Sequence, residues 1–362
     1  MDTLAFLHHL EAQPDYAGQM AHVEHLPPRR AAYAELDRSL VPELQDLLQE
    51  QGLLPLYTHQ VAAVNLTCRG ENVMVATSSA SGKTLCYNIP VLEALLIEPG
   101  SRALYLFPTK ALAQDQLRSL HQLVGSGLLG MEELATFDGD TPRAERSEIR
   151  KKVRIVLTNP DMLHLGIMPN HQSWSRLLRH LRYVVIDEAH IYRGVFGSHV
   201  AGVMRRLRRL CHLYGSDPRF ICCSATIANP GEHAVRLAGL PFVVVDSDGS
   251  PHGGKDFVFW NPPIIDEAKS ARRSANSEAT DLFTELVNRN VRTLTFARTR
   301  RLTELIYIYS QQRLAETGLT CAERIKPYRA GYLPQERRQI EQELFNGQLL
   351  GVVATNALEL GI

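Results

Sequence analysis

A lysine at the end of a small-residue loop is the first sign of chemistry in this chain. Lys83 belongs to the segment Thr77-Ser78-Ser79-Ala80-Ser81-Gly82-Lys83-Thr84, which joins a short apolar run to a longer, helix-forming apolar stretch. In such a loop, backbone N–H groups and the start of the helix hold phosphates, and the lysine reaches the β- and γ-phosphates. The segment therefore predicts a phosphate-binding loop in which all eight residues contact a nucleotide and Lys83 is catalytic.

Two adjacent carboxylates supply the second half of this chemistry. Asp187 and Glu188 follow another apolar run, about a hundred residues after the loop. A carboxylate at the carboxyl end of a strand next to the loop strand is where such sites hold Mg²⁺. We expect Asp187 and the Thr84 hydroxyl to bind Mg²⁺, and Glu188 to orient and deprotonate the attacking water. Each motif alone also fits a simpler interpretation: a chance Gly-Lys-Thr at a helix start, or a solvated turn.

Short apolar runs must position these residues. Six candidate strands alternate with stretches long enough for crossover helices, which predicts an α/β fold built on a parallel, doubly wound sheet. In such a sheet the loop and the carboxylates lie at the same edge. The expected strands are Val73–Ala76, Ala103–Phe107, Ile155–Leu157, Tyr183–Ile186, Phe220–Cys223 and Phe242–Val245.

The rest of the chain divides into three segments around this sheet domain, which is expected over residues 55–250. Leucines at helical spacing predict a helical extension over residues 1–54. A Gly/Ser/Pro-rich composition predicts a linker at 251–277. A second β/α pattern follows at 278–362, with helices expected near 278–289 and 301–315 and strands at Thr293–Phe296 and Val352–Ala354.

The composition is that of an ordinary folded protein. The chain has 362 residues, of which 44% are hydrophobic, and its formal net charge is zero. This zero does not exclude nucleic acid as a partner, because residues 1–60 carry a net charge of −6 and residues 61–362 carry +6. The sequence has no apolar run of about 18 residues, no secretory signal and no CxxC pair. We therefore expect a cytoplasmic monomer with no membrane contact.

The ordered motifs resemble those of superfamily 2 helicases of the DEAD/DEAH-box type. Asp187-Glu188-Ala189-His190 is similar to motif II of that family, although Thr77 and Ala80 stand at loop positions where helicases commonly have glycine. The segments 187–200 and 328–332 resemble the bacterial and fungal DNA-repair branch related to the mitomycin-repair helicase. The other similar segments are Leu56–Gln60 (Q motif), Pro108–Ala113 (Ia), Thr158–His164 (Ib), Ser224–Thr226 (III), Phe296–Arg300 (IV) and Ala354–Ile362 (the start of V).

The resemblance implies a complete RecA-like ATP-binding domain followed by a second, incomplete RecA-like domain. It implies an ATP-dependent helicase or translocase that uses Mg²⁺ and moves 3′ to 5′ on single-stranded or partly duplex DNA, in DNA repair. ATP would lie between the two domains, and its hydrolysis would drive stepwise movement along one strand. Within the Q motif, Gln60 would read the adenine edge.

The resemblance also marks candidate contacts with nucleic acid. Motifs Ia and Ib supply Thr109, Lys110, Thr158 and Asn159, and the second domain supplies Arg298, Arg300 and Thr355. Loop capping and solvated surface are the simpler interpretation of these side chains. Contacts with a phosphate backbone carry no sequence information, so binding is expected to be sequence-independent and salt-sensitive. Further hydrogen bonds, linking the γ-phosphate to the nucleic-acid face, are expected from His190, Ser224 and Thr226.

Two alternatives stay open. RNA could replace DNA, because these motifs discriminate poorly between the two. The chain could also be a fragment that binds ATP and nucleic acid with little activity. In the family, motif VI brings arginine fingers to the γ-phosphate, and no such segment occurs between Thr355 and Ile362. The zinc-binding domain usual in the DNA-repair branch is absent too, so we expect a chain that stops inside motif V.

Overall fold

The structure consists of two compact units. The computed structural model describes residues 3–125, 127–268, 271–316, 320–329 and 331–358. One unit is Pro28–Gly253, and the other combines Met1–Pro27 with Gly254–Ile362. Ala330 and the last four residues of the segment that resembles motif V, 359–362, lie outside the described residues. Within the described part of the chain, no helix is both long enough and apolar enough to cross a membrane.

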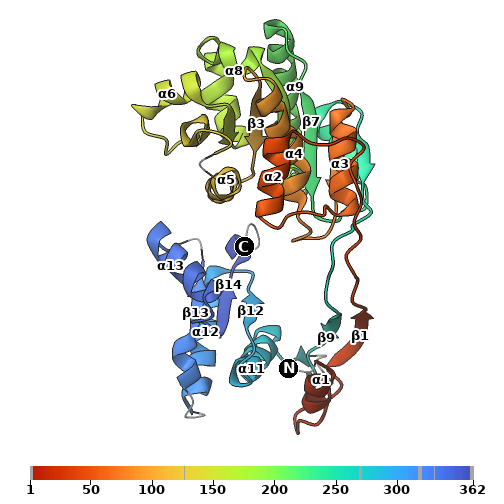
Figure 1. Ribbon diagram of the computed structural model, residues 1–362. Coiled ribbons are helices and arrows are strands. Elements are labelled where there is room, and N and C mark those ends of the chain that lie inside the picture. Colours follow the sequence, from red (N-terminus) through yellow and green to blue (C-terminus); the bar gives the residue numbers. More distant parts are fainter. Residues whose placement is uncertain (1–2, 126, 269–270, 317–319, 330, 359–362) are drawn as a thin grey trace. The chain divides into compact units, whose positions relative to one another are not determined.

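A seven-stranded sheet forms the centre of the unit 28–253 (Figure 1). Its order is β4-β5-β3-β6-β7-β2-β8, and every neighbouring pair is parallel. The predicted parallel α/β sheet is confirmed, and all six predicted strands are present with ends within two residues. The strands are β2 (Val73–Ala76), β3 (Arg102–Leu106), β4 (Leu134–Thr136), β5 (Ile155–Thr158), β6 (Leu181–Ile186), β7 (Arg219–Ser224) and β8 (Val243–Val245).

Helices cover both faces of this sheet, so its strands are buried on both sides. Met74, Val184 and Phe220 pack in one cluster with α9 and α10. On the opposite face, the Tyr105 ring meets the Tyr87 ring of α4 edge-on, with 5.3 Å between the centroids. The helices of the unit are α2 (Pro42–Glu50), α3 (Thr58–Cys68), α4 (Lys83–Ile97), α5 (Lys110–Val124), α6 (Glu145–Lys152), α7 (Pro160–Met162), α8 (Ser175–Arg179), α9 (Gly194–Tyr214) and α10 (Pro230–Ala238).

A three-stranded parallel sheet, of order β12-β14-β13, organises the second unit. Val353 is fully buried there against a core that includes Phe283 and Ile306. The predicted helices and strands of this region are present, and β13 and α13 are additions to them. The elements are α11 (Ala275–Asn288), α12 (Arg300–Glu316), α13 (Pro334–Phe345), β12 (Thr293–Phe296), β13 (Ile325–Tyr328) and β14 (Gly351–Ala354).

A long-range strand pair joins two segments that were predicted as helix and linker. Helices α1 (Thr3–Glu11) and α2 do lie within residues 1–54, but β1 (Met20–Leu26) is a strand and pairs antiparallel with β9 (Lys255–Trp260). β9 lies inside the predicted linker, which also holds the short strands β10 (Ile264–Asp266) and β11 (Ala271–Arg272). β1 is mostly exposed, and its partner strand is more than 200 positions away. Local hydrophobic periodicity therefore could not reveal the pair.

Candidate active site

The loop and the carboxylates lie at one edge of the seven-stranded sheet. β7 pairs with both β2 and β6, and the register sets Ala76 level with Ser224, and Ile186 level with Cys222. Because the three strands are parallel, the chain leaves them on the same side of the sheet. β2 continues directly into the loop, and β6 continues into Asp187.

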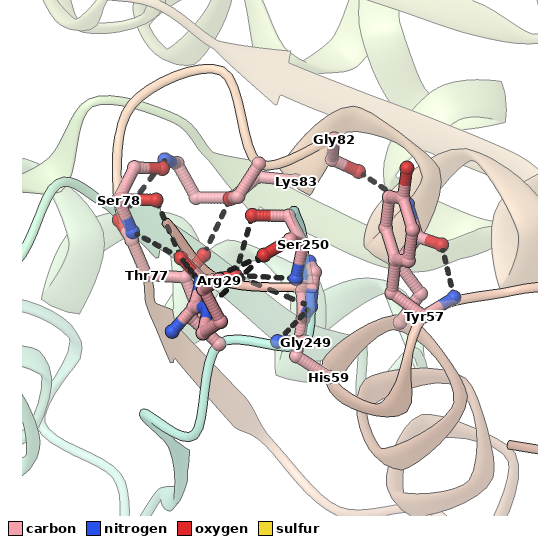
Figure 2. A network of polar contacts seen from close by, with 12 residues as sticks. Arg29, Tyr57, His59, Thr77, Ser78, Gly82, Lys83, Gly249 and Ser250 are labelled. Carbon is pink, nitrogen blue, oxygen red and sulfur yellow. Dashed lines mark hydrogen bonds and ion pairs between the residues drawn. The ribbon is translucent and has the colours of Figure 1, made fainter. Parts of the chain in front are cut away.

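Polar contacts inside the loop hold its two ends together, as Figure 2 shows. The hydroxyls of Thr77 and Ser81 are 2.7 Å apart, and both residues are buried. Lys83 Nζ donates to the backbone carbonyls of Ser78, at 2.6 Å, and Thr77, at 3.2 Å. The ammonium group that is predicted to bind phosphate thus donates hydrogen bonds to carbonyls of its own loop in this structure.

Two residues of the loop adopt left-handed backbone conformations. Ala80 has φ of 59° and Gly82 has φ of 80°, and Ser79 and Ala80 are exposed. α4 begins at Lys83, directly after these turns. The first N–H groups of a helix lack partners within the helix, so this position can hold an anion.

Gln60 connects the segment before α3 to the loop. Its Oε1 accepts the N–H of Tyr57 at 2.9 Å, and its Nε2 donates to the Gly82 carbonyl at 3.0 Å. A Cβ atom on residue 82 would lie 2.7 Å from Gln60 Nε2, so a side chain there would displace the Gln60 amide, and the positive φ also favours glycine. Gln60 therefore belongs to the framework of the loop, and its reading of adenine stays a prediction.

Asp187 is a buried carboxylate next to α4. Its Oδ2 accepts the Tyr87 hydroxyl at 3.1 Å, and its Oδ1 accepts the N–H of Glu188 at 2.8 Å. Burial and the neighbouring Glu188 carboxylate raise the pKa of Asp187 to about 6. Burial also raises the pKa of Glu188, and Lys83 opposes that rise. The two carboxylates form a negative site that a cation would stabilise.

The donors at this point suit Mg²⁺, which prefers oxygen ligands and commonly takes one or two carboxylates with water and phosphate oxygens. The Tyr87 hydroxyl interacts with the side chains of both Thr84 and Asp187, which places those two predicted ligands near one oxygen atom. Among the residues that the structure describes, no group of three or more His, Cys, Asp or Glu side chains could hold a metal. Thr84 and Asp187 offer oxygen donors of the kind that Mg²⁺ takes, and their binding of the ion stays a prediction.

Three residues are predicted to link the γ-phosphate to the nucleic-acid face. His190 lies beside the carboxylates, and Ser224 and Thr226 lie at the end of β7. His190 Nδ1 is 3.3 Å from Glu188 Oε2. Ser224 is fully buried and its hydroxyl donates to the Ala225 carbonyl at 2.7 Å, whereas Thr226 is exposed. The hydrogen-bonded link itself stays a prediction.

Thr109 and Lys110 follow β3 on the same side of the sheet. The Thr109 hydroxyl caps α5 by accepting the N–H of Leu112 at 3.3 Å. Lys110 Nζ is 3.0 Å from Asp140 Oδ1, and the lysine side chain is 45% exposed. Because Lys110 and its partner Asp140 are both exposed, their ion pair is weak, and the ammonium group is readily available to a phosphate group.

Thr158 and Asn159 are used within the fold. Thr158 is buried at the end of β5, and its hydroxyl donates to the Phe137 carbonyl at 2.5 Å. The Asn159 Oδ1 caps α7 by accepting the N–H of Met162 at 2.8 Å. The expected presentation of the Thr158 hydroxyl to a phosphate backbone is therefore wrong for this structure, because that hydroxyl already satisfies a buried carbonyl.

The remaining predicted nucleic-acid residues belong to the second unit. The parallel pair β12–β14 sets Phe296 level with Ala354, so Arg298 and Thr355 follow neighbouring strand ends. Arg298 and Arg300 are exposed, and Arg300 begins α12. Thr355 is 7% exposed.

A carboxylate that the sequence analysis missed contacts the loop. Asp248, in the segment after β8, accepts the N–H and the hydroxyl of Ser78 at Oδ2, at 3.2 and 2.5 Å. Its Oδ1 accepts the N–H and the hydroxyl of Ser250, at 2.8 and 2.7 Å, and Arg29 Nη2 is 3.0 Å from Oδ2. Although burial opposes ionisation, the hydrogen bonds from Ser78, Ser250 and Arg29 hold the pKa of Asp248 well below its ordinary value. The Ser/Gly/Pro-rich sequence around Asp248 indicates a linker, and no local pattern marks the contact.

Residues 57–233 match the DEAD/DEAH box helicase family. The chain contains a DEAD/DEAH box helicase domain. The resemblance drawn from the ordered motifs is thereby confirmed, and the domain match includes both the phosphate-binding loop and the Asp187–His190 segment.

Relatives from bacteria and yeast extend this match over nearly the whole chain. The uncharacterized ATP-dependent helicase YprA of Bacillus subtilis is 48% identical over 337 residues, which are 93% of this chain and 45% of that protein. ATP-dependent helicase HRQ1 of Saccharomyces cerevisiae is 43% identical over 98% of this chain and 33% of that protein. The crystal structure of the DUF1998 helicase MrfA bound to DNA and AMPPNP is 45% identical, with a TM-score of 0.90 over 99% of this chain and 49% of that one. The chain thus spans about a third to a half of the length of these relatives.

Asp248→Asn should remove stability that depends on pH. The pKa of Asp248 is lower in the folded chain than in the unfolded chain, where it is near 3.8. The ionised carboxylate therefore stabilises the fold at pH values above 3.8, and this contribution is lost as the pH falls below that value. The wild-type chain should exceed Asp248→Asn in free energy of unfolding by about 1–3 kcal/mol at neutral pH. Urea denaturation should show that gap closing below about pH 4.

Asp37→Asn is the matched control, because Asp37 is 54% exposed in its ion pair with Arg69. It should change the free energy of unfolding by less than about 1 kcal/mol. His59 Nδ1 is 3.9 Å from Asp248 Oδ1, and burial lowers the pKa of His59, which moves its titration toward acid pH. The effect of Asp248 is therefore taken from the difference between wild type and Asp248→Asn at each pH. A gap between wild type and Asp248→Asn that is constant from neutral to acid pH would contradict the depressed pKa.

Proposed function

We propose that this chain is the ATP-hydrolysing motor region of a DNA helicase or translocase. The observation that carries the proposal is the common sheet edge at which Lys83 and Thr84 begin α4 and Asp187 and Glu188 follow β6. A phosphate-binding helix start beside two carboxylates suits transfer of a phosphoryl group to water. Relatives that are named ATP-dependent helicases support this choice among phosphoryl-transfer enzymes.

Each residue of the site has a distinct task in hydrolysis. Lys83 exchanges the carbonyls of Thr77 and Ser78 for oxygens of the β- and γ-phosphates, and the first N–H groups of α4 bind the remaining charge. Mg²⁺, when bound through Thr84 and Asp187, neutralises charge on the phosphates. Glu188 orients the attacking water and accepts its proton at the side-chain carboxylate.

Nucleic acid is the second ligand, and DNA is the choice that we favour. The MrfA structure was determined bound to DNA and AMPPNP, and it is 45% identical to this chain. In this chain, Lys110 of the first unit and Arg298 and Arg300 of the second are exposed cations next to strand ends. They contact backbone phosphates, and such contacts bind without sequence preference. Movement 3′ to 5′ and a role in DNA repair follow from the family resemblance alone.

Communication between the two ligands runs through the end of β7 and the segment after β6. His190 is close to the Glu188 carboxylate, so a change at the γ-phosphate would reach its ring through Glu188. Ser224 is the last residue of β7, the strand that lies between β2 and β6, and Thr226 follows it. A hydrogen-bonded chain through these residues would couple hydrolysis to movement on nucleic acid.

Lys83→Ala should abolish ATP hydrolysis that depends on nucleic acid. Loss of a charged donor to the transferred phosphate should lower the stimulated rate by about 100-fold or more. Lys152→Ala is the control, since Lys152 is 61% exposed on α6 and pairs with Glu148. Phosphate release is measured with single-stranded DNA, with RNA of the same sequence and without nucleic acid. Stimulation retained in Lys83→Ala would refute the assigned phosphate site, and stimulation by RNA alone would replace DNA as the substrate.

Lys110→Ala should weaken DNA binding in a way that depends on salt. Neutralisation of one single-strand phosphate contributes about 0.7 to the slope of log affinity against log salt concentration. Fluorescence anisotropy with two unrelated oligonucleotides should show that slope reduced by about 0.7 for both sequences. Lys152→Ala should leave the slope unchanged. Equal slopes for wild type and Lys110→Ala would contradict a phosphate contact by Lys110.

A further inference from the structure

The phosphate-binding loop has residues other than glycine at two positions where the sequence pattern or the backbone conformation favours glycine. Thr77 stands at the first position of the loop, where the phosphate-binding pattern has glycine. Ala80 adopts φ of 59°, a left-handed conformation that is strained for a residue with a side chain. The loop therefore depends on contacts that hold its backbone in place.

Besides the hydrogen bond from Gln60 to the Gly82 carbonyl, three sets of contacts supply this support. One joins the hydroxyls of Thr77 and Ser81, and the second runs from Lys83 to the carbonyls of Thr77 and Ser78. The third runs from Ser78 to Asp248. Lys83 has three N–H donors, so binding oxygens of both the β- and γ-phosphates removes at least one of its two carbonyl contacts. The contact with Asp248 does not involve Lys83 and can persist.

Asp248 is itself held as a rigid anchor. Its side chain is 9% exposed, and both carboxylate oxygens accept hydrogen bonds. Arg29 pairs with Asp248 and also donates from Nε and Nη2 to the Ser250 carbonyl, at 3.1 and 2.9 Å. The backbones of Arg29 and His252 exchange two hydrogen bonds, of 2.9 and 3.0 Å. Figure 2 shows Arg29 and Ser250 beside the loop residues Thr77 and Ser78.

We propose that Asp248 is a positioning residue for the nucleotide. It fixes the backbone of Ser78, so that the loop keeps its phosphate-binding shape after Lys83 has moved to the phosphates. Arg29 serves this role indirectly by holding Asp248. The inference rests on the proposed function, because it assigns Asp248 to the binding of the same nucleotide.

A double-mutant cycle tests whether Asp248 acts through Ser78. The variants are Asp248→Ala, Ser78→Ala and the double substitution, and Asp37→Ala is the control. We measure the Kd for a fluorescent ATP analogue, and the kcat and KM of DNA-stimulated ATP hydrolysis. Asp248→Ala should raise Kd and KM about 10-fold, which corresponds to about 1.4 kcal/mol, with kcat within about 2-fold. Both single substitutions disrupt the same contact, between Ser78 and Asp248. The double variant should therefore bind the nucleotide no more weakly than Asp248→Ala does.

Several results would overturn the inference. One is an unchanged Kd in a folded Asp248→Ala chain, and another is a loss of kcat with unchanged KM. A third is a double variant whose rise in Kd equals the product of the two single rises. If Asp248→Ala does not fold, Ser78→Ala decides, since it removes only one hydroxyl, and an unchanged Kd would then count against the role. Lys83→Ala separates this inference from the proposed function. Loss of nucleotide binding in Lys83→Ala but not in Asp248→Ala removes the inference alone, and retained binding in Lys83→Ala removes both.

Discussion

Parallel pairing of β2, β7 and β6 is the constraint on which the candidate site depends. Lys83 and Asp187 are about a hundred positions apart in the sequence, and only the shared neighbour β7 brings their strand ends to one edge. A slip of one residue in either register would turn every side chain of the strand to the opposite face. Close packing of helices on both faces opposes that slip, because each buried side chain, such as Met74 or Val75, would have to fit the packing of the opposite face.

Two aspartates at this edge show opposite pKa shifts for reasons that bear on their roles. Asp248 accepts hydrogen bonds from Ser78 and Ser250 and pairs with Arg29, so its charge is fully compensated within the fold. Asp187 accepts two hydrogen bonds but lies beside the Glu188 carboxylate, so its charge is not compensated. A compensated carboxylate suits an anchor, and an uncompensated one suits a ligand for a cation. The distinction supports a structural task for Asp248 and a chemical task for Asp187.

The sequence predicts those parts of the fold that are encoded by local patterns. The strands of the large sheet are buried on both faces and therefore appear as continuous apolar runs, which made β2 and its neighbours predictable. β13 escaped prediction because Pro327 interrupts it, although proline is tolerated in a strand at the edge of a sheet. β1 is almost wholly exposed, β9 alternates between exposed and half-buried residues, and their pairing depends on residues far apart in the sequence.

The candidate site shows the same division between local and long-range information. Lys83 and Asp187 belong to motifs that are contiguous in sequence, so their chemistry could be inferred before their positions were known. Asp248 lies in a segment whose composition indicates a linker, and only the return of the chain after β8 brings it to Ser78. The Thr158 hydroxyl illustrates the converse error, since a motif position was taken as available although the fold uses it to satisfy the Phe137 carbonyl.

We propose that this edge of the sheet binds one nucleoside triphosphate together with Mg²⁺. Isothermal titration calorimetry with a non-hydrolysable ATP analogue tests it most directly, with wild type and Asp187→Asn each titrated in the presence and absence of Mg²⁺. We expect a single site per wild-type chain, whose affinity for the ATP analogue is at least about 10-fold lower when Mg²⁺ is omitted. In Asp187→Asn, omission of Mg²⁺ should have little effect. Binding in wild type that is indifferent to Mg²⁺, or no saturable binding at all, would contradict the account.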